Sequence, residues 1–254
     1  MQTIKQIAQK IETPKVTNLP NQITSHQNSV CQPGCPICGG IGFVRYDRPI
    51  EHPRFGKLEP CPSLDPVKLY GPRVGLIEKE LKLSWNSLID YNKIGLAINE
   101  IQAAIDEGYG WIFIWGAYGL GKTTLLKTAI AEVLRSGRQS AYVRMVDIID
   151  DLRNAFSTEN PSETSASRLE FWTEVPVLAI DEFDRIRLTE FAQERRFALM
   201  DHRYENAIRG NSITIMASNS DPRDLDGYLA DRIFDGRFKI IQLGGNSFRP
   251  NLGE

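Results

Sequence analysis

The segment Gly116–Thr123, with the sequence GAYGLGKT, fits the pattern G-x-x-x-x-G-K-[ST] at every fixed position. The apolar residues 111–115 before it are typical of a buried strand, and residues 124–134 after it have helical spacing and good helix formers. A glycine-rich turn between a strand and a helix directs backbone N–H groups and the helix N-terminus at an anion. The sequence therefore predicts a phosphate cradle for a nucleoside triphosphate.

Two side chains of this segment are expected to act directly on the ligand. Lys122 is expected to reach the β- and γ-phosphates, and the Thr123 hydroxyl is expected to hold Mg²⁺. The other residues expected to bind the nucleotide, which we take to be ATP, are Gly116, Ala117, Tyr118, Gly119, Leu120, Gly121 and Thr124.

An apolar strand that ends in two acids follows further along the chain, where residues 177–180 lead into Asp181 and Glu182. In a chain with this phosphate cradle, Asp181 is expected to support Mg²⁺, while Glu182 orients or polarises the attacking water. Asn219 ends the next predicted strand, where it can position that water or sense the γ-phosphate. Asparagine also suits the start of a turn at 219–222.

Three arginines near the C-terminus are candidates for contacting phosphate. Arg232 or Arg237, in the segment 229–237, could supply a charge-stabilising arginine to the nucleotide of a neighbouring subunit. Arg249 could reach the nucleotide of its own chain. From the residues alone, a surface ion pair is the preferred interpretation of each arginine.

Apolar strands alternate with helical patterns through the larger part of the chain. Strands are predicted at 111–115, 140–145, 175–180 and 212–217, and helices at 92–107, 122–136, 147–156, 162–173 and 189–209. This alternation predicts a parallel α/β sheet with helices on both faces. No internal repeat is apparent.

The N-terminal part divides differently. Residues 1–12 could form a short amphipathic helix or a frayed terminus, and residues 13–34 read as a linker rich in Pro, Asn, Gln, Ser and Thr. We expect three parts: a helix and linker over 1–30, a cysteine module over 31–66, and the larger domain over 67–254.

All four cysteines lie between Cys31 and Cys61, with Cys35 and Cys38 in a C-x-x-C spacing. Four thiolates are enough for a tetrahedral Zn²⁺ site, and a module of this size needs such a site because its apolar core is small. Cys61 has no second cysteine beside it, so either Cys31 or His52 completes the ligand set. A saturated zinc site favours a structural and partner-binding role over chemistry.

Composition excludes several classes of protein. The chain has 254 residues, 41% hydrophobic and 24% charged, with a net charge of −2, so no global basic field indicates nucleic acid. Any DNA contact must come from local patches. No apolar run is long enough for a membrane span, and the N-terminus lacks a secretory signal. With a clustered cysteine site, these features predict a cytoplasmic protein without a membrane partner.

The order of these motifs is similar to that of a known family. It runs from the Gly116–Thr123 cradle through Asp181-Glu182, Asn219 and Asp231-Arg232-Ile233 to Asn246-Ser247-Phe248-Arg249. Over roughly residues 80–252 the chain resembles the AAA+ ATPases of bacterial helicase loaders, the DnaC/DnaI group, and the related IstB-type transposition helpers. The resemblance implies an AAA+ fold, an arginine finger at Arg232 or Arg237, a second sensor at Arg249, and helicase contact through the N-terminal region.

Three functions are compatible with these features. The first is a loader that grips a replicative DNA helicase and helps place it on single-stranded DNA. The second is a helper ATPase that assembles on DNA and recruits a transposase, and the third is a nucleotide-binding adaptor with negligible turnover. The cysteine module favours the loader. An arginine supplied by a second copy would require self-association through the ATPase domain, with slow hydrolysis until a partner or DNA binds.

Overall fold

The computed structural model describes residues 31–51, 55–56, 58–65, 67, 74–88, 94–155, 164–187 and 189–247, together with the backbone of 16–17. The chain divides into two compact units, Met1–Leu69 and Tyr70–Glu254. The predicted helix at 1–12 and the candidate residues His52 and Arg249 lie outside the described residues. In the part of the chain that is described, no helix is long and apolar enough to cross a membrane.

The larger unit is built on a five-stranded sheet in which every neighbouring pair is parallel. The order across the sheet is β5-β6-β7-β4-β8. The strands are β4 (Gly110–Trp115), β5 (Ser140–Arg144), β6 (Val177–Asp181), β7 (Ile213–Ser218) and β8 (Lys239–Gln242). Because all five point the same way, their carboxyl ends meet at one edge of the sheet. The predicted α/β class is confirmed.

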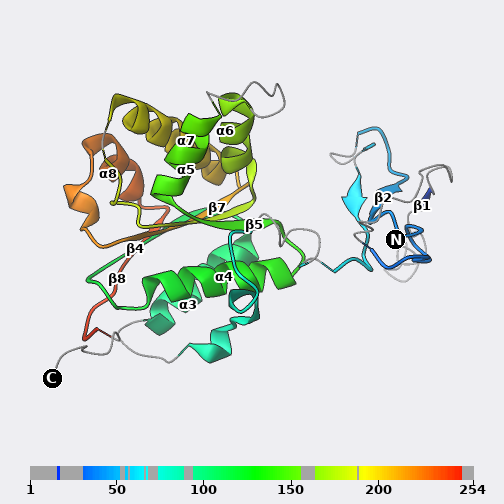
Figure 1. The fold of residues 1–254 in the computed structure, drawn as a ribbon, viewed down its shortest axis with the longest axis horizontal. Helices are drawn as coiled ribbons and strands as arrows, with labels where there is room; N and C mark the ends of the chain where they lie inside the picture. Colours follow the sequence, from blue (N-terminus) through cyan, green and yellow to red (C-terminus); the bar gives the residue numbers. More distant parts are fainter. Residues whose placement is uncertain are drawn as a thin grey trace, which may run out of the picture. The chain divides into compact units, whose positions relative to one another are not determined.

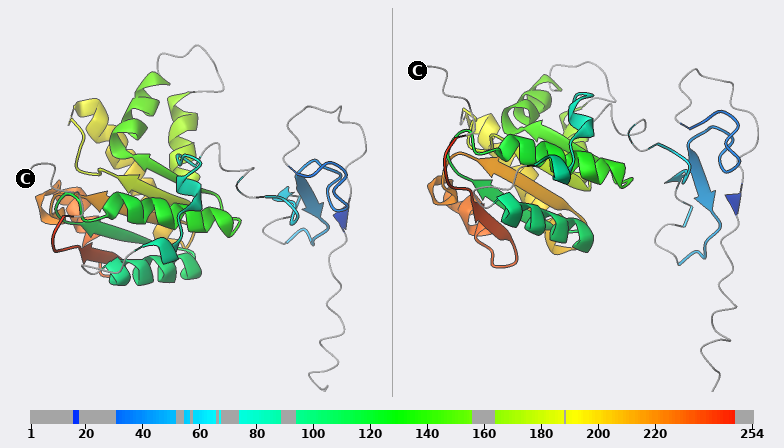
Figure 2. Two further views of the ribbon diagram at one scale, coloured as in Figure 1. Left: turned by 60° about the horizontal axis from the view of Figure 1, so that its bottom comes forward. Right: turned by 90° about the horizontal axis from the view of Figure 1, so that it is seen from below.

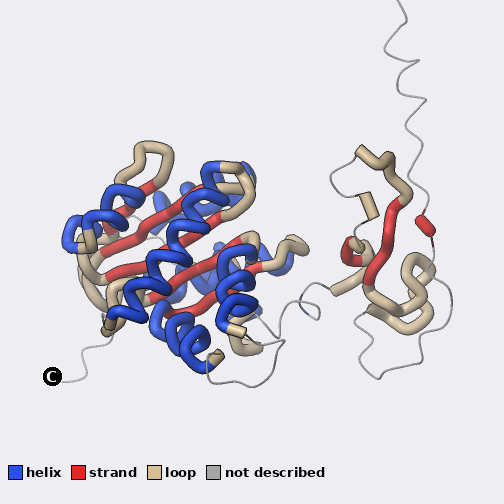
Figure 3. The backbone as a smooth tube through the Cα atoms, turned by 90° about the horizontal axis from the view of Figure 1, so that it is seen from above, coloured by secondary structure: helices blue, strands red, loops and turns tan. Residues whose placement is uncertain are grey.

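Helices cover both faces of this sheet (Figure 1). Two of them, α3 (Ile94–Glu107) and α4 (Lys122–Arg135), pack on one face. The opposite face is covered by α5 (Met145–Asn154), α6 (Ser165–Glu174), α7 (Glu190–Ile208) and α8 (Gly227–Ile233). Figures 2 and 3 show the strands enclosed between these two helical layers.

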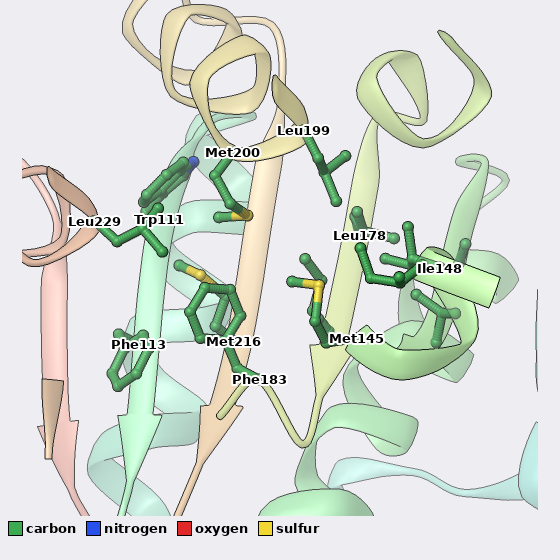
Figure 4. Close-up of a cluster of buried hydrophobic side chains, with 14 of the residues drawn as sticks. Trp111, Phe113, Met145, Ile148, Leu178, Phe183, Leu199, Met200, Met216 and Leu229 are labelled. Atoms are coloured by element: carbon green, nitrogen blue, oxygen red, sulfur yellow. The ribbon is translucent and has the colours of Figure 1, made fainter. Parts of the chain in front are cut away.

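The strands are apolar on both faces because each face packs on helices. Alternate residues of β4 point in opposite directions: Trp111 and Phe113 belong to the core beneath α5, α7 and α8, whereas Ile112 and Ile114 face the other side. The core that contains Trp111 and Phe113 also contains Met145, Ile148, Leu178, Leu199, Met200, Met216 and Leu229 (Figure 4). This arrangement explains why the strands read as continuous apolar runs rather than as alternating ones.

One strand and several boundaries differ from the prediction. Strand β8 was not predicted from the sequence, because its four residues, KIIQ, contain only two apolar side chains. The predicted strand at 175–180 begins at Val177, since Pro176 has no N–H to donate, although its carbonyl accepts the N–H of Ile213. The remaining predicted elements agree with the structure within about three residues, which is the usual uncertainty of element ends.

A fully buried arginine joins the second helical layer to the sheet. Arg203, on α7, has no exposed surface, and burial lowers the pKa of its guanidinium to about 9. Its nitrogens donate five hydrogen bonds, to Thr214 Oγ1 and to the carbonyl oxygens of Trp172, Thr173, Val175 and Ile213. Two of these carbonyls lie in the last turn of α6, where a cation is favoured. The arginine therefore ties α6, α7 and the start of β7 together.

The smaller unit contains a three-stranded antiparallel sheet. Its order is β1-β2-β3, formed by Val16–Thr17, Phe43–Tyr46 and Glu59–Pro60. The prediction of a linker over 13–34 is therefore wrong at Val16–Thr17, which pairs with Tyr46 and Arg45. Among the described residues, the buried core of this unit consists of the four cysteines with Val44 and Leu64, so cysteine side chains make up most of it.

Replacing Arg203 with lysine is expected to lower the free energy of unfolding by about 2–4 kcal/mol, because a single ammonium cannot satisfy all five acceptors that the guanidinium reaches. Urea unfolding followed by circular dichroism measures this change. Arg209→Lys, at an exposed position directly after the end of α7, should stay within about 0.5 kcal/mol of the wild type. Equal stability of the two variants would contradict the role of Arg203.

Candidate functional site

The Gly116–Thr123 segment forms a loop between β4 and α4 at the carboxyl edge of the sheet. Three of its glycines, Gly116, Gly119 and Gly121, have positive φ values of 147°, 79° and 83°, a region that other residues rarely adopt. Gly121 is the N-cap of α4 and supplies no side chain to the first N–H groups of the helix. These N–H groups are therefore available for an anion.

Two of the glycines are also required by close approach. A Cβ atom on Gly116 would lie 2.4 Å from the carbonyl oxygen of Leu243, and one on Gly119 would lie 2.0 Å from Oγ of Ser247. The Leu243 N–H donates to the carbonyl of Trp115 at 2.8 Å. The chain that leaves β8 thus packs directly against the loop, and larger residues would displace it.

Lys122 is almost completely buried at the start of α4. Its ammonium donates to the carbonyl oxygens of Gly116 and Ala117 at 2.6 and 2.8 Å, so it is folded onto the loop itself. Phosphate oxygens are stronger acceptors for an ammonium than neutral carbonyls. The residues present therefore fit a nucleotide phosphate, with Lys122 as its cationic partner.

Asp181 brings several elements together at the end of β6. Its Oδ2 accepts hydrogen bonds from Thr123 Oγ1 at 2.7 Å and from the Tyr142 hydroxyl at 2.8 Å, and its Oδ1 accepts the Glu182 N–H. The carboxylate is buried. Burial, followed by the charge of Asp181, raises the pKa of Tyr142, which keeps the phenol protonated as a donor. Carboxylate and hydroxyl oxygens are the ligands that Mg²⁺ prefers, so Asp181 and Thr123 fit that ion.

Glu182, the second acid, has a φ of 49° and is the only non-glycine residue with positive φ among those that the structure describes. Its Oε1 lies 3.7 Å from NH1 of Arg185, whose guanidinium also stacks over the ring of Tyr118 at 5.5 Å. Such a backbone conformation costs about 1–3 kcal/mol and is concentrated at functional sites. The strained turn points to a functional reason for the position of Glu182.

Asn219 follows β7, which lies between the strands that carry the loop and Asp181. The β7 residue Ser218 pairs with Trp115, so Asn219 lies at the same level as the start of the loop. Its N–H donates to Asp184 at 3.3 Å, and Ser220 Oγ donates to the same carboxylate at 2.9 Å. Asp184 thereby holds the turn that presents Asn219.

The two candidate finger arginines do not join this site within one chain. Both follow β7 and precede β8 in the chain. Arg237 comes just before the start of β8, and Arg232 lies over Tyr204, which packs on Trp111 near the amino end of β4. Arg232 donates to Asp201 at 2.6 Å and stacks on Tyr228, and only 18% of its side chain is exposed. Arg237 pairs with Asp235 and is 58% exposed. Lys122, by contrast, lies at the carboxyl edge.

Three residues of the site were not found by sequence analysis. Tyr142 lies in an apolar strand and reads as core. Arg185 lies three residues after Glu182, but nothing in the sequence links it to Tyr118. Asp184 carried a signal, because it follows Asp181 and Glu182 closely as a third acid. The other two are recognised only when distant segments are brought together.

The four cysteine sulfurs of the smaller unit lie within 4.8 Å of one another, and all four residues are buried. The sulfurs of Cys35 and Cys61 are 3.8 Å apart, which matches the separation of about 3.8 Å between two ligands of a tetrahedral site with Zn–S bonds of about 2.3 Å. The structure thus places Cys31 with Cys35, Cys38 and Cys61. The donor set is compatible with Zn²⁺.

Backbone N–H groups prepare these sulfurs for a cation. N–H groups of Cys38 and Ile37 lower the pKa of Cys35 to about 6, and the Gly42 N–H donates to the Cys38 sulfur at 3.3 Å. Burial, followed by the neighbouring thiols of Cys38 and Cys35, raises the pKa of Cys31 to about 12. Cys35 therefore ionises readily without metal. The positive charge of Zn²⁺ would stabilise the thiolates of the other three cysteines.

Purified protein is expected to contain about one zinc per chain, measured by elemental analysis. Cys35→Ser and Cys61→Ser should lose that zinc and unfold the smaller unit, because sulfur makes up most of its core. Cys31→Ser tests the fourth ligand against His52→Ala. Zinc that is retained in Cys31→Ser but lost in His52→Ala would assign the fourth position to the histidine, and metal-free wild-type protein would refute the site.

Solved structures of replication proteins have a similar fold. The replication initiator DnaA bound to AMPPCP and single-stranded DNA is 25% identical, with a TM-score of 0.52, over 67% of this chain and 51% of that chain. The crystal structure of the DnaC helicase loader is 18% identical, with a TM-score of 0.53, over 66% of this chain and 100% of that chain. The second likeness establishes the fold alone.

A curated relative extends the similarity in sequence. The chromosomal replication initiator protein DnaA of Corynebacterium aurimucosum is 28% identical over 211 residues, which cover 82% of this chain and 34% of the relative. This chain therefore spans about a third of the length of that relative.

A family model covers the site itself. Residues 90–240, more than half of the chain, match the model of the bacterial DnaA ATPase domain. The matched range contains the glycine-rich loop, Asp181 with Glu182, Asn219 and both candidate finger arginines. On this match, the chain belongs to the family of the bacterial DnaA ATPase domain.

Proposed function

We propose that this protein is an ATP-dependent AAA+ loader, which binds a replicative DNA helicase through its N-terminal unit and helps place it on single-stranded DNA. The observation that carries the nucleotide part is the 2.7 Å hydrogen bond between Thr123 and Asp181, which joins the glycine-rich loop to the end of β6. This hydrogen bond supports both side chains as Mg²⁺ ligands, because they meet beside the loop whose helix N-terminus has no side-chain cap.

Each residue of the site has a distinct task in hydrolysis. The N–H groups of the loop and the Lys122 ammonium bind the phosphates, and Thr123 and Asp181 hold Mg²⁺, which neutralises phosphate charge when bound. Glu182 orients the attacking water and accepts its proton. Asn219, at the end of the strand between the other two groups, positions that water.

A second copy of the chain completes this site. The two candidate finger arginines lie near the amino ends of the strands, so neither reaches the nucleotide of its own chain. Arg237 is favoured as the finger because it is more exposed than Arg232, whose guanidinium is covered by Tyr228 and paired with Asp201. Self-association through the ATPase domain then regulates hydrolysis.

The cysteine unit is the proposed helicase-binding part. Four cysteine ligands would leave zinc without an open coordination position, which favours a structural role for the metal. The same unit exposes large apolar side chains that its small core does not cover, namely Ile41, Ile50, Phe55 and Leu58. Exposed apolar side chains of this kind favour protein association. Single-stranded DNA is proposed because a DnaA relative was solved with it.

The helicase proposal predicts that the full-length protein retains a replicative helicase from a lysate in a pull-down with ATP, identified by mass spectrometry. Ile50→Ser, at a 77% exposed position, should weaken retention about tenfold or more, because it removes apolar contact area. Leu96→Ser, at an exposed position on α3, is the matched control and should behave as the wild type.

Lys122→Ala should abolish ATP binding, as measured by calorimetry. In the same pull-down, helicase retention by this variant should no longer depend on ATP. Recovery of a transposase in place of a helicase would instead support the transposition helper. Unchanged ATP affinity of Lys122→Ala would refute the phosphate cradle.

The shared site predicts that specific ATPase activity rises with protein concentration. Arg237→Ala should bind ATP normally and lose this rise, since a finger arginine contributes about 10³–10⁵ in rate. Arg153→Ala, which removes an exposed ion-paired arginine from α5, is the matched control. Loss of the rise in Arg232→Ala but not in Arg237→Ala would identify the rival finger, and turnover independent of concentration would refute a shared site.

A further inference from the structure

Tyr142 connects the Asp181 carboxylate, which is proposed to hold Mg²⁺, to the segment Val74–Glu80 beside the edge strand β5. Its hydroxyl donates to Oδ2 of Asp181 at 2.8 Å, the same oxygen that accepts from Thr123 at 2.7 Å. Two donors from different elements therefore hold this oxygen, while the Glu182 N–H holds the other oxygen of the carboxylate. The phenol reaches Asp181 from β5, the strand beside β6, where Arg144 pairs with Asp181 in the register.

The ring of Tyr142 lies beneath a partly buried ion pair. The Lys127 ammonium lies 4.9 Å from the ring centroid and binds Glu80 Oε1 at 2.7 Å, and both side chains are about one-fifth exposed. The other carboxylate oxygen of Glu80 accepts the Ile77 N–H at 3.0 Å. A cation held over an aromatic face is attracted by it, so this pair restrains the ring.

The backbone of Tyr142 is held by the same segment. Its N–H donates to the carbonyl of Val74 at 2.8 Å, on the outer side of the edge strand β5. Gly75 has a φ of 76°, and a Cβ atom there would lie 2.0 Å from the Tyr142 carbonyl oxygen. The segment Val74–Glu80 therefore contacts Tyr142 through its backbone and, by way of Lys127, through its ring.

We propose that Tyr142 is a positioning residue for Asp181, and that the segment Val74–Glu80 sets the position of the Tyr142 ring and backbone. Because Val74–Glu80 contacts the backbone of Tyr142 and, through Lys127, its ring, a shift of this segment would change Mg²⁺ affinity through Asp181. The proposal rests on the Mg²⁺–ATP site of the proposed function, and it does not depend on the identity of the partner.

Removing the phenol oxygen has a specific expected consequence. Hydrogen-bond partners of metal-holding side chains typically contribute a factor of about 10–100 to metal affinity. Without the Tyr142 hydroxyl, Asp181 Oδ2 keeps only Thr123 as a donor and can turn away from the metal position. The phosphate cradle lies on a different loop and makes no use of this hydroxyl, so binding of nucleotide without metal should be unaffected.

The first experiment titrates Mg²⁺ into full-length protein with a fluorescent ATP analogue. Tyr142→Phe should need about 10–100-fold more Mg²⁺ for half-saturation, while its metal-free affinity for the analogue stays at the wild-type value. Tyr204→Phe is the matched control, because its hydroxyl also donates to an aspartate, Asp235, at 2.7 Å, but near the amino ends of the strands. A wild-type Mg²⁺ midpoint in Tyr142→Phe would overturn the proposal, as would an equal loss of binding with and without metal.

The second experiment tests the segment. Gly75→Ala should raise the Mg²⁺ midpoint as Tyr142→Phe does, whereas Gly108→Ala, at φ 90° with nothing within 4 Å of the added Cβ, should not. The double variant Gly75→Ala/Tyr142→Phe should show no further loss, because both changes act on one contact. Additive losses, or a wild-type midpoint in Gly75→Ala, would overturn control by the segment. Failure of the wild type to bind the analogue at all would refute the nucleotide site instead, and failure to retain a helicase would leave this inference standing.

Discussion

The parallel pairing of β6, β7 and β4 determines where every group of the candidate nucleotide site lies. Because the three strands point the same way, the glycine-rich loop, Asn219 and Asp181 all emerge at one edge of the sheet. The Asp181 carboxylate then completes the arrangement, since it accepts hydrogen bonds from α4 through Thr123 and from β5 through Tyr142. A shift of one strand would separate these groups.

The two edges of the sheet have different roles. Near the amino ends of the strands, the Arg203 guanidinium donates hydrogen bonds to carbonyl oxygens at the end of α6 and the start of β7, which would otherwise need water. These hydrogen bonds hold the second helical layer in a fixed position on the sheet. The exposed arginine Arg237 lies near that edge as well. Under the proposed function, a nucleotide at the carboxyl ends of the strands and Arg237 near their amino ends would suit an assembly in which Arg237 of one copy faces the nucleotide of the next.

The smaller unit has a different basis for stability. Among the residues that the structure describes, its core contains the four cysteines and two aliphatic side chains, Val44 and Leu64, so burial of aliphatic side chains contributes little. If the proposed zinc is bound, metal binding would be the main source of folding free energy in a unit of this kind. The apolar side chains that remain exposed on it are free to contact a partner.

Local patterns determined much of this protein. The sequence by itself predicted the glycine-rich loop, the acids after β6, the cysteine cluster and most helices, because each depends on residue types at short, regular spacing. Tertiary structure alone decided the role of Tyr142 and Arg203, and the existence of β8. Tyr142 reads as a core residue and Arg203 as an exposed charge on a helix, since no local pattern indicates a hydrogen bond to a carboxylate or carbonyl from another element. Those contacts arise only when the sheet brings distant segments within hydrogen-bonding distance.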